Sequence, residues 1–166
     1  MGAWLALQNI GETMRFEKKC HKSSLSDQDI KDAEEVVVSI PRDLMNLYRQ
    51  KNGGIPSRGI FIAENGDEYL LDYLFPIPEV RLEPANQNIV KVNLALKQQH
   101  LIPDDNLAFG SDPGGNYFSI DRSDNSIWYH PMDMWEEDRS PQENQKSTME
   151  KLSESFPAFL HALAEQ

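Results

Sequence analysis

Cysteine is almost absent from the chain, with Cys20 as the only one among 166 residues. A single thiol can form neither an internal disulfide nor a zinc site built from cysteines. It is typical of a protein in a reducing compartment, so we expect a cytoplasmic protein. No apolar stretch approaches the roughly 18 residues of a transmembrane helix. The first residues also lack the basic region and the apolar length of a secretion signal.

Basic residues are scarce as well. Lys and Arg total 16 against 27 Asp and Glu, which gives a net charge of −11. Such a chain repels phosphate backbones and anionic lipids, and this argues against direct binding of nucleic acid or of a membrane surface. The charge instead favours a basic protein partner, or serves solubility alone.

The length fits one domain with its own hydrophobic core. Apolar residues make up 39% of the chain, and a domain of this size buries roughly two thirds of its unfolded surface without a metal or disulfide. The only basic stretch lies within residues 1–25, which we interpret as an N-terminal leader or a first helix. Residues 26–166 form the predicted domain.

Helix signals dominate the first part of this domain. Ser26 is a typical N-cap, and the Ile40-Pro41 step predicts a break before a second helix. Pro41 suits the first position of that helix, and Asn52-Gly53-Gly54 supplies a left-handed residue to end it. The predicted inward residues of the two helices are Ile30, Ala33, Val37, Leu44, Leu47 and Tyr48.

Short strands and turns follow. Periodicity and turn residues predict strands at 59–63, 69–75, 107–110, 117–121 and 127–130. Helices are expected over 86–99 and after Ser155, and a loop over 136–147. This order predicts an α+β fold, a largely antiparallel mixed sheet with helices packed on one side.

Catalytic and metal-binding motifs are weak. The glycine-rich loop at 112–116 lacks the Lys and the following helix of a phosphate-binding loop, so we interpret it as a turn. His130 could act as an acid–base group with Asp133 or Asp112, which leaves an unrecognised hydrolase as one hypothesis. We expect no cofactor and no metal.

The charge pattern carries more information. Between Asp104 and Asp138 there are nine acidic residues and one basic residue, Arg122, for a local charge of −8. The same stretch carries Tyr117, Trp128, Tyr129 and Trp135, and acids around aromatic anchors form a plausible surface for a basic protein. A solvated acidic face with the aromatics turned inward is the alternative. The candidate contact residues are Asp104, Asp105, Asp112, Trp128, Asp133, Trp135, Glu136 and Glu137.

Two motifs resemble those of the SUKH superfamily, which includes Smi/Knr-type domains such as that of the yeast cell-wall-assembly regulator and is common in bacteria. The first motif consists of Ile40-Pro41, Leu44, Leu47-Tyr48 and Asn52-Gly53-Gly54. The second consists of Leu107–Asp112, Gly114-Gly115-Asn116 and Tyr117–Asp121, with Ile127–His130 and the closing Ser155-Phe156 and Phe159-Leu160. The resemblance spans about residues 25–164. Pro113 interrupts the second motif, and Asn116 stands where the family often has Asp.

The resemblance implies a non-catalytic domain and, for bacterial members, an immunity protein that neutralises a polymorphic toxin, often a nuclease. A nuclease surface must be positive to hold phosphate, so an acidic inhibitor fits such a partner. We expect a monomer or a weak dimer. The alternative is a binding module for a small molecule or a regulatory protein, which a pocket lined by Tyr117, Trp128 and His130 would favour.

Overall fold

The computed structural model describes residues 24–80 and 85–165. The predicted leader or first helix in residues 1–25 therefore lies, apart from Ser24 and Leu25, outside the described residues. The helices are α2 (Asp27–Val37), α3 (Arg42–Gln50), α4 (Ile89–Gln98), the 3₁₀ helix η1 (Met132–Met134), α5 (Pro141–Thr148) and α6 (Phe156–Ala162). The strands are β1 (Arg58–Ile62), β2 (Glu68–Leu70), β3 (Tyr73–Leu74), β4 (Asn106–Ser111), β5 (Tyr117–Asp121), β6 (Ile127–His130), β7 (Glu150–Ser153) and β8 (Ala164–Glu165).

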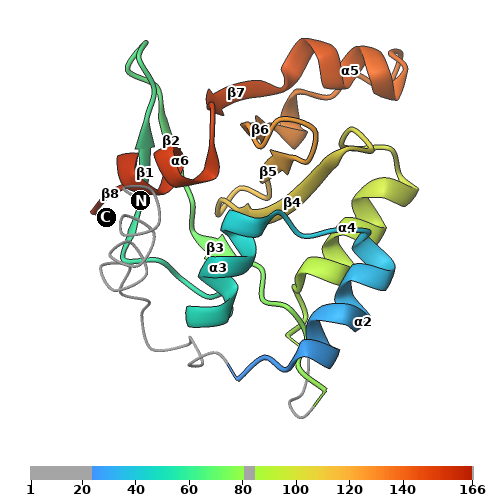
Figure 1. Cartoon of the computed structure of the whole chain (residues 1–166). Helices are drawn as coiled ribbons and strands as arrows, with labels where there is room; N and C mark the ends of the chain where they lie inside the picture. Colours follow the sequence, from blue (N-terminus) through green and yellow to red (C-terminus); the bar gives the residue numbers. More distant parts are fainter. Residues whose placement is uncertain (1–23, 81–84, 166) are drawn as a thin grey trace.

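The strands form two antiparallel sheets, with the orders β2-β1-β8 and β3-β4-β5-β6-β7. Helix α4 contacts β4, and α2 lies beside α4 (Figure 1). Helix α6 lies next to β1 and also contacts β7. The predicted α+β class with antiparallel strands is confirmed, although the sequence did not indicate a division into two sheets.

The prediction of one strand over 69–75 is wrong, because the chain passes from one sheet to the other in that segment. Leu71 N donates to Gly59 O in the small sheet, whereas Asp72 N donates to Ser111 O at the end of β4. This crossing lies close to Gly110, where an added Cβ would be 2.5 Å from a methyl carbon of Leu71 and 2.7 Å from the Tyr73 carbonyl oxygen. Glycine at position 110 therefore leaves room for the segment 71–73 to cross from the small sheet to the large one.

The first helix begins as predicted. Ser26 is the N-cap of α2, and its side chain and that of Asp29 form a reciprocal capping box. Ala33 and Val37 are buried on the predicted face. The C-cap is Val38, an exposed β-branched residue with φ of 76°, a conformation that costs free energy for any residue with a Cβ.

The second helix is also confirmed, with Leu44, Leu47 and Tyr48 buried. Pro41 is its N-cap rather than its first residue. Gly53 has φ of 80° but lies two residues beyond the C-cap, and an added Cβ there would be 2.6 Å from the backbone nitrogen of Pro76. The glycine is thus needed for close packing of two chain segments, not for ending the helix.

Aromatic residues of α6 join the two sheets. The ring of Phe159 stacks on Phe61 of β1 at 5.3 Å between centroids, and it lies 6.0 Å from the rings of Phe109 and Phe118 in the large sheet. Phe156 packs edge-on against Phe109 at 5.3 Å. The helix predicted after Ser155 is therefore confirmed, and its buried residues Phe156 and Phe159 join the two sheets in the core.

The predicted loop over 136–147 is wrong, since α5 begins at Pro141. Ser140 and Glu143 form a capping box, and proline occupies the start of the helix, so the local start signal was present. The buried residues of α5 are Asn144 and Thr148, both polar. No hydrophobic period therefore marks this helix in the sequence. Strand β7, which follows α5, was not predicted either.

Candidate protein-binding surface

The fold divides the predicted acidic stretch between two ends of the large sheet. Asp104 and Asp105 precede β4, whereas Asp112 follows it, and the strand between them spans about 17 Å. The end that carries Asp104 also carries cations. Arg122 Nη2 and Lys97 Nζ donate to the Asp104 carbonyl oxygen at 2.7 and 3.0 Å. Part of the negative charge at this end is therefore offset.

The opposite end is organised by the turn that follows β4. Asp112 Oδ1 accepts from Asn116 N at 2.9 Å, and Asp112 Oδ2 accepts from Asn116 Nδ2 at 2.8 Å and from the Tyr129 hydroxyl at 2.6 Å. Partial burial acts to raise the pKa of Asp112, but these hydrogen bonds outweigh it and leave the pKa below its ordinary value. The carboxylate is therefore held both in position and in its charged form.

The same turn positions η1, because Asn116 Oδ1 accepts from Met132 N at 2.8 Å. The Asn116 side chain thus donates to Asp112 and accepts from η1 at once, which an amide can do and a carboxylate cannot. This explains why Asn rather than Asp fits at position 116. Through this link, η1 with the exposed Asp133 lies at the end of the sheet that carries Asp112.

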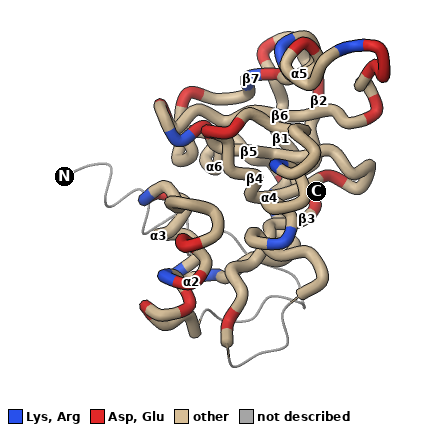
Figure 2. Tube along the Cα trace, turned by 90° about the vertical axis from the view of Figure 1, so that its right-hand side faces the viewer, with Lys and Arg blue, Asp and Glu red and all other residues tan. Residues whose placement is uncertain are grey.

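The loop after η1 carries the remaining candidates. Trp135 is half-buried, and Glu136 and Glu137 are exposed. Glu136 N donates to Asn144 Oδ1 at 2.9 Å, which ties the loop to α5, and the Glu136 carboxylate lies 3.0 Å from Arg139 Nε. Figure 2 shows acidic positions on this loop and around α5.

Trp128 is separated from these residues. It faces Ser119 and Lys151 in the strand register and lies next to Ile127, the first residue of β6. It is half-buried, and its Nε1 donates to Ser126 Oγ at 2.8 Å. The fold therefore brings together Asp112 and Asp133, followed along the chain by Trp135, Glu136 and Glu137. Asp104 and Asp105 lie at the opposite end of β4 from Asp112. Helix α5, which holds the Glu136 loop, is hydrogen-bonded to the segment before them, where Gln145 Nε2 donates to the His100 carbonyl oxygen at 2.7 Å.

A groove of about 590 Å³ lies beside the Asp112–Asn116 turn. Its walls include Asp72 and Tyr73 from the β3 edge, Asp112 and Pro113 from the turn, and Tyr117 from β5. Sequence reasoning missed Asp72 and Tyr73 because nothing in a short predicted strand marks which of its residues will border a groove. Of the pocket residues expected for the small-molecule alternative, Tyr117 lines this groove, whereas Trp128 and His130 are not among its lining residues.

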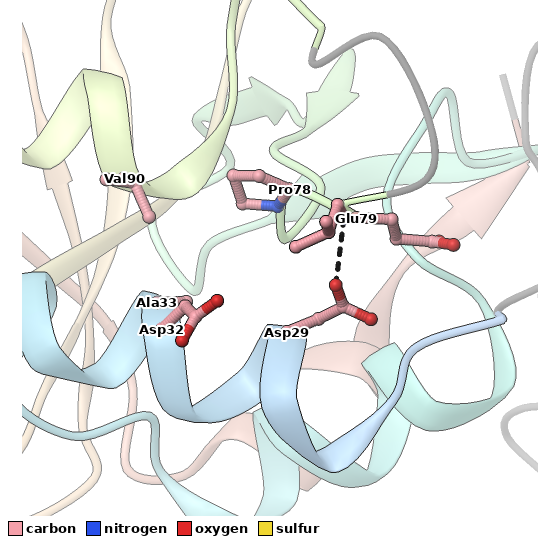
Figure 3. A pocket seen from close by; sticks show the side chains of 7 residues that line it. Asp29, Asp32, Ala33, Pro78, Glu79 and Val90 are labelled. Atoms are coloured by element: carbon pink, nitrogen blue, oxygen red, sulfur yellow. Dashed lines mark hydrogen bonds between the residues drawn. The ribbon is translucent and has the colours of Figure 1, made fainter.

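A smaller cavity of about 320 Å³ lies between α2, α4 and the segment 78–80. In Figure 3, Ala33, Pro78 and Val90 face it, with Asp32 at its side. The Asp29 carboxylate accepts from Val80 N at 2.8 Å and so fixes that segment on the helix. None of the predicted contact residues lies in this cavity.

His130 does not form the acid–base pair that the hydrolase hypothesis requires. It is 2% exposed, and its Nε2 lies 2.7 Å from Ser119 Oγ, which in turn accepts from Asn106 Nδ2 at 2.7 Å. Ser119 is fully buried, so no substrate can reach this Ser–His pair. Burial lowers the pKa of His130 to about 4, which keeps the ring neutral near pH 7. We interpret the network as structural.

Among residues 24–80 and 85–165, no group of three or more His, Cys, Asp or Glu side chains is arranged to hold a metal ion. In the same part of the chain, no helix has the length and apolar character needed to cross a membrane.

The sequence was compared with models of protein families and with curated proteins. The model of the SMI1 / KNR4 family (SUKH-1) matches residues 24–162, which include all of the strands and helices described above except β8. A search of curated proteins finds no match.

Proposed function

The chain belongs to the SMI1 / KNR4 family (SUKH-1), and from this membership we propose that it is a bacterial immunity protein. In this role it binds a cognate toxin in the cytoplasm and blocks the toxin without catalysing a reaction. The toxin has a basic surface, as expected of a nuclease, because the net charge of −11 favours such a partner.

The proposed contact surface begins at the Asp112 end of the large sheet and continues onto the loop that Glu136 ties to α5. It consists of Asp112, Asp133, Trp135, Glu136 and Glu137. The observation that carries this assignment is the Asn116 side chain, which joins the Asp112 turn to η1. Acids that are distant in sequence are thereby held on rigid elements, so little conformational entropy is lost when a partner binds.

The mechanism is electrostatic attraction followed by steric occlusion. Negative charge on the immunity protein accelerates the encounter with a basic surface, and this acceleration weakens as salt increases. Trp135, half-buried beside Glu136, supplies an aromatic contact of the kind that often contributes most to binding free energy. The covered surface of the toxin is then closed to its substrate.

A pair of charge reversals tests the surface. In one variant, Glu136→Lys and Glu137→Lys are combined. The matched control combines Asp104→Lys and Asp105→Lys, which changes the net charge equally at the other end of the sheet. With the toxin encoded by a neighbouring gene, calorimetry should show at least about tenfold weaker binding for the first variant than for the control.

Equal weakening in the two variants would show that only net charge matters and that the surface is assigned wrongly. If the wild-type chain bound no toxin at all, the proposed function itself would fail. Unfolding curves of both variants check that each is folded.

The second candidate is a binding module for a small molecule or a regulatory protein, without a toxin. One observation favours it, because the groove volume of about 590 Å³ falls in the range of small-molecule sites. Capture of a defined cellular protein by the wild-type chain, in cells that lack any toxin gene, would support this candidate.

A further inference from the structure

We propose that the groove beside the Asp112 turn binds a single arginine side chain of the protein partner, with Asp72 as the carboxylate that pairs with it. This inference rests on the proposed function, since it supposes a protein partner. It adds a site outside the predicted acidic stretch and names the partner group that enters it.

The groove has an aromatic wall that suits such a side chain. Tyr73 and Tyr117 line it, and both rings pack against Phe75, with centroids at 6.1 and 6.3 Å. Phe75 is fully buried, so it fixes the two tyrosine rings from behind. An aromatic wall of this kind packs against the stem of an arginine and attracts its cation.

Asp72 differs from Asp112 in the state of its carboxylate. Asp112 already accepts three hydrogen bonds, two from Asn116 in its own turn and one from the Tyr129 hydroxyl of β6. Asp72 is half-buried in the groove wall, and its carboxylate makes no hydrogen bond or ion pair with any residue in 24–80 or 85–165. Its oxygens are therefore available to a donor that enters from outside, whereas those of Asp112 mainly supply charge.

The charges in the groove select a cation. In the part of the chain that the structure describes, its lining residues include Asp72 and Asp112 but neither Lys nor Arg. A concave site with charge of one sign concentrates its field, which raises the local concentration of the opposite charge. A guanidinium group can pair bidentately with a carboxylate and stack on a tyrosine ring, so we expect arginine to bind more tightly than lysine.

The direct test is an NMR titration of the full chain with the peptide acetyl-Gly-Arg-Gly-amide. The same peptide with citrulline is the control, because citrulline has the shape of arginine without its charge. We expect the amide signals of Tyr73, Ser111 and Tyr117 to shift with the arginine peptide and not with the citrulline peptide. Asp72→Asn should weaken this binding about tenfold. Glu68→Gln, an exposed acid on β2 that does not line the groove, should leave it unchanged.

Equal binding of the two peptides, shifts that spread over all acidic surfaces, or an unaffected Asp72→Asn variant would overturn the inference. A second readout separates it from the proposed function. If the toxin binds Asp72→Asn as tightly as the wild type, the groove assignment fails while toxin binding stands. If the arginine peptide binds in the groove but no toxin binds the chain, the proposed function fails instead.

Discussion

Protonation of His130 is a sharp test of how the buried polar network stabilises the fold. The ring lies in the interior of the large sheet, and the groups it faces there, Ser119 and through it Asn106, are neutral. Among residues 24–80 and 85–165, no carboxylate forms a hydrogen bond or ion pair with the ring that could stabilise a positive charge. Burial therefore favours the neutral ring and lowers its pKa from 6.5 to about 4.

The lowered pKa predicts a loss of stability in acid. Above about pH 6.5, the ring is neutral in both the folded and the unfolded chain. As the pH falls below 6.5, the unfolded chain binds a proton that the folded chain does not, so the free energy of unfolding decreases until about pH 4. The gap between 6.5 and about 4, at about 1.4 kcal/mol per pH unit, gives a loss of about 3 kcal/mol.

Urea unfolding followed by tryptophan fluorescence measures this loss. The wild type is compared with His130→Gln, whose amide can keep the hydrogen bond to Ser119 but cannot bind a proton. Between about pH 7 and pH 4, the wild type should lose about 3 kcal/mol more than the variant. His161→Gln changes an exposed histidine of α6 and should lose as much as the wild type.

This comparison cancels the titration of the many carboxylates, which all three proteins share. If the wild type and His130→Gln lost stability in parallel, the ring would not be held neutral by burial. An NMR titration of the His130 ring with a midpoint near 6.5 would refute the reasoning directly.

Three other substitutions test the fold. Asn116→Asp puts a second carboxylate beside Asp112 and removes the donor to it, so we expect a loss of about 1–3 kcal/mol at pH 7, partly recovered in acid as the pair takes up a proton; urea unfolding at both pH values checks this. Phe159→Ala removes the ring that joins the two sheets and should cost about 3–5 kcal/mol, measured by thermal and urea unfolding. Val38→Gly relieves a β-branched residue at φ of 76° and should raise the free energy of unfolding by about 1 kcal/mol, whereas no change would show that position to be unstrained.

Local signals predicted most of the elements. The Ser26 cap and the burial of Leu44, Leu47 and Tyr48 were correct because a cap and a helical face depend on residues within a few positions of one another. Helix α5 was missed although Ser140 carries the same kind of capping signal. Its buried residues are polar, so the hydrophobic period that identifies a helix was absent.

The candidate surface was predicted only in part. The acidic stretch between Asp104 and Asp138 was visible, but antiparallel strands send successive turns to opposite ends of a sheet. Asp104 and Asp112 are therefore separated, while Asp112 and Asp133 meet at one end. No sequence pattern marked Asp72 as a site residue. It borders the groove only because the chain crosses between the two sheets at that position.

The amino-acid order alone determined the net charge, the starts of most helices and the turn residues, since each depends on composition or on hydrogen bonds within one turn of the chain. Only the tertiary structure decided which acids share a surface, that α6 unites the two sheets, and that Asp72 and Tyr117 line one groove. These features depend on strand pairing and on packing between segments far apart in sequence, and no local pattern encodes which segments will meet.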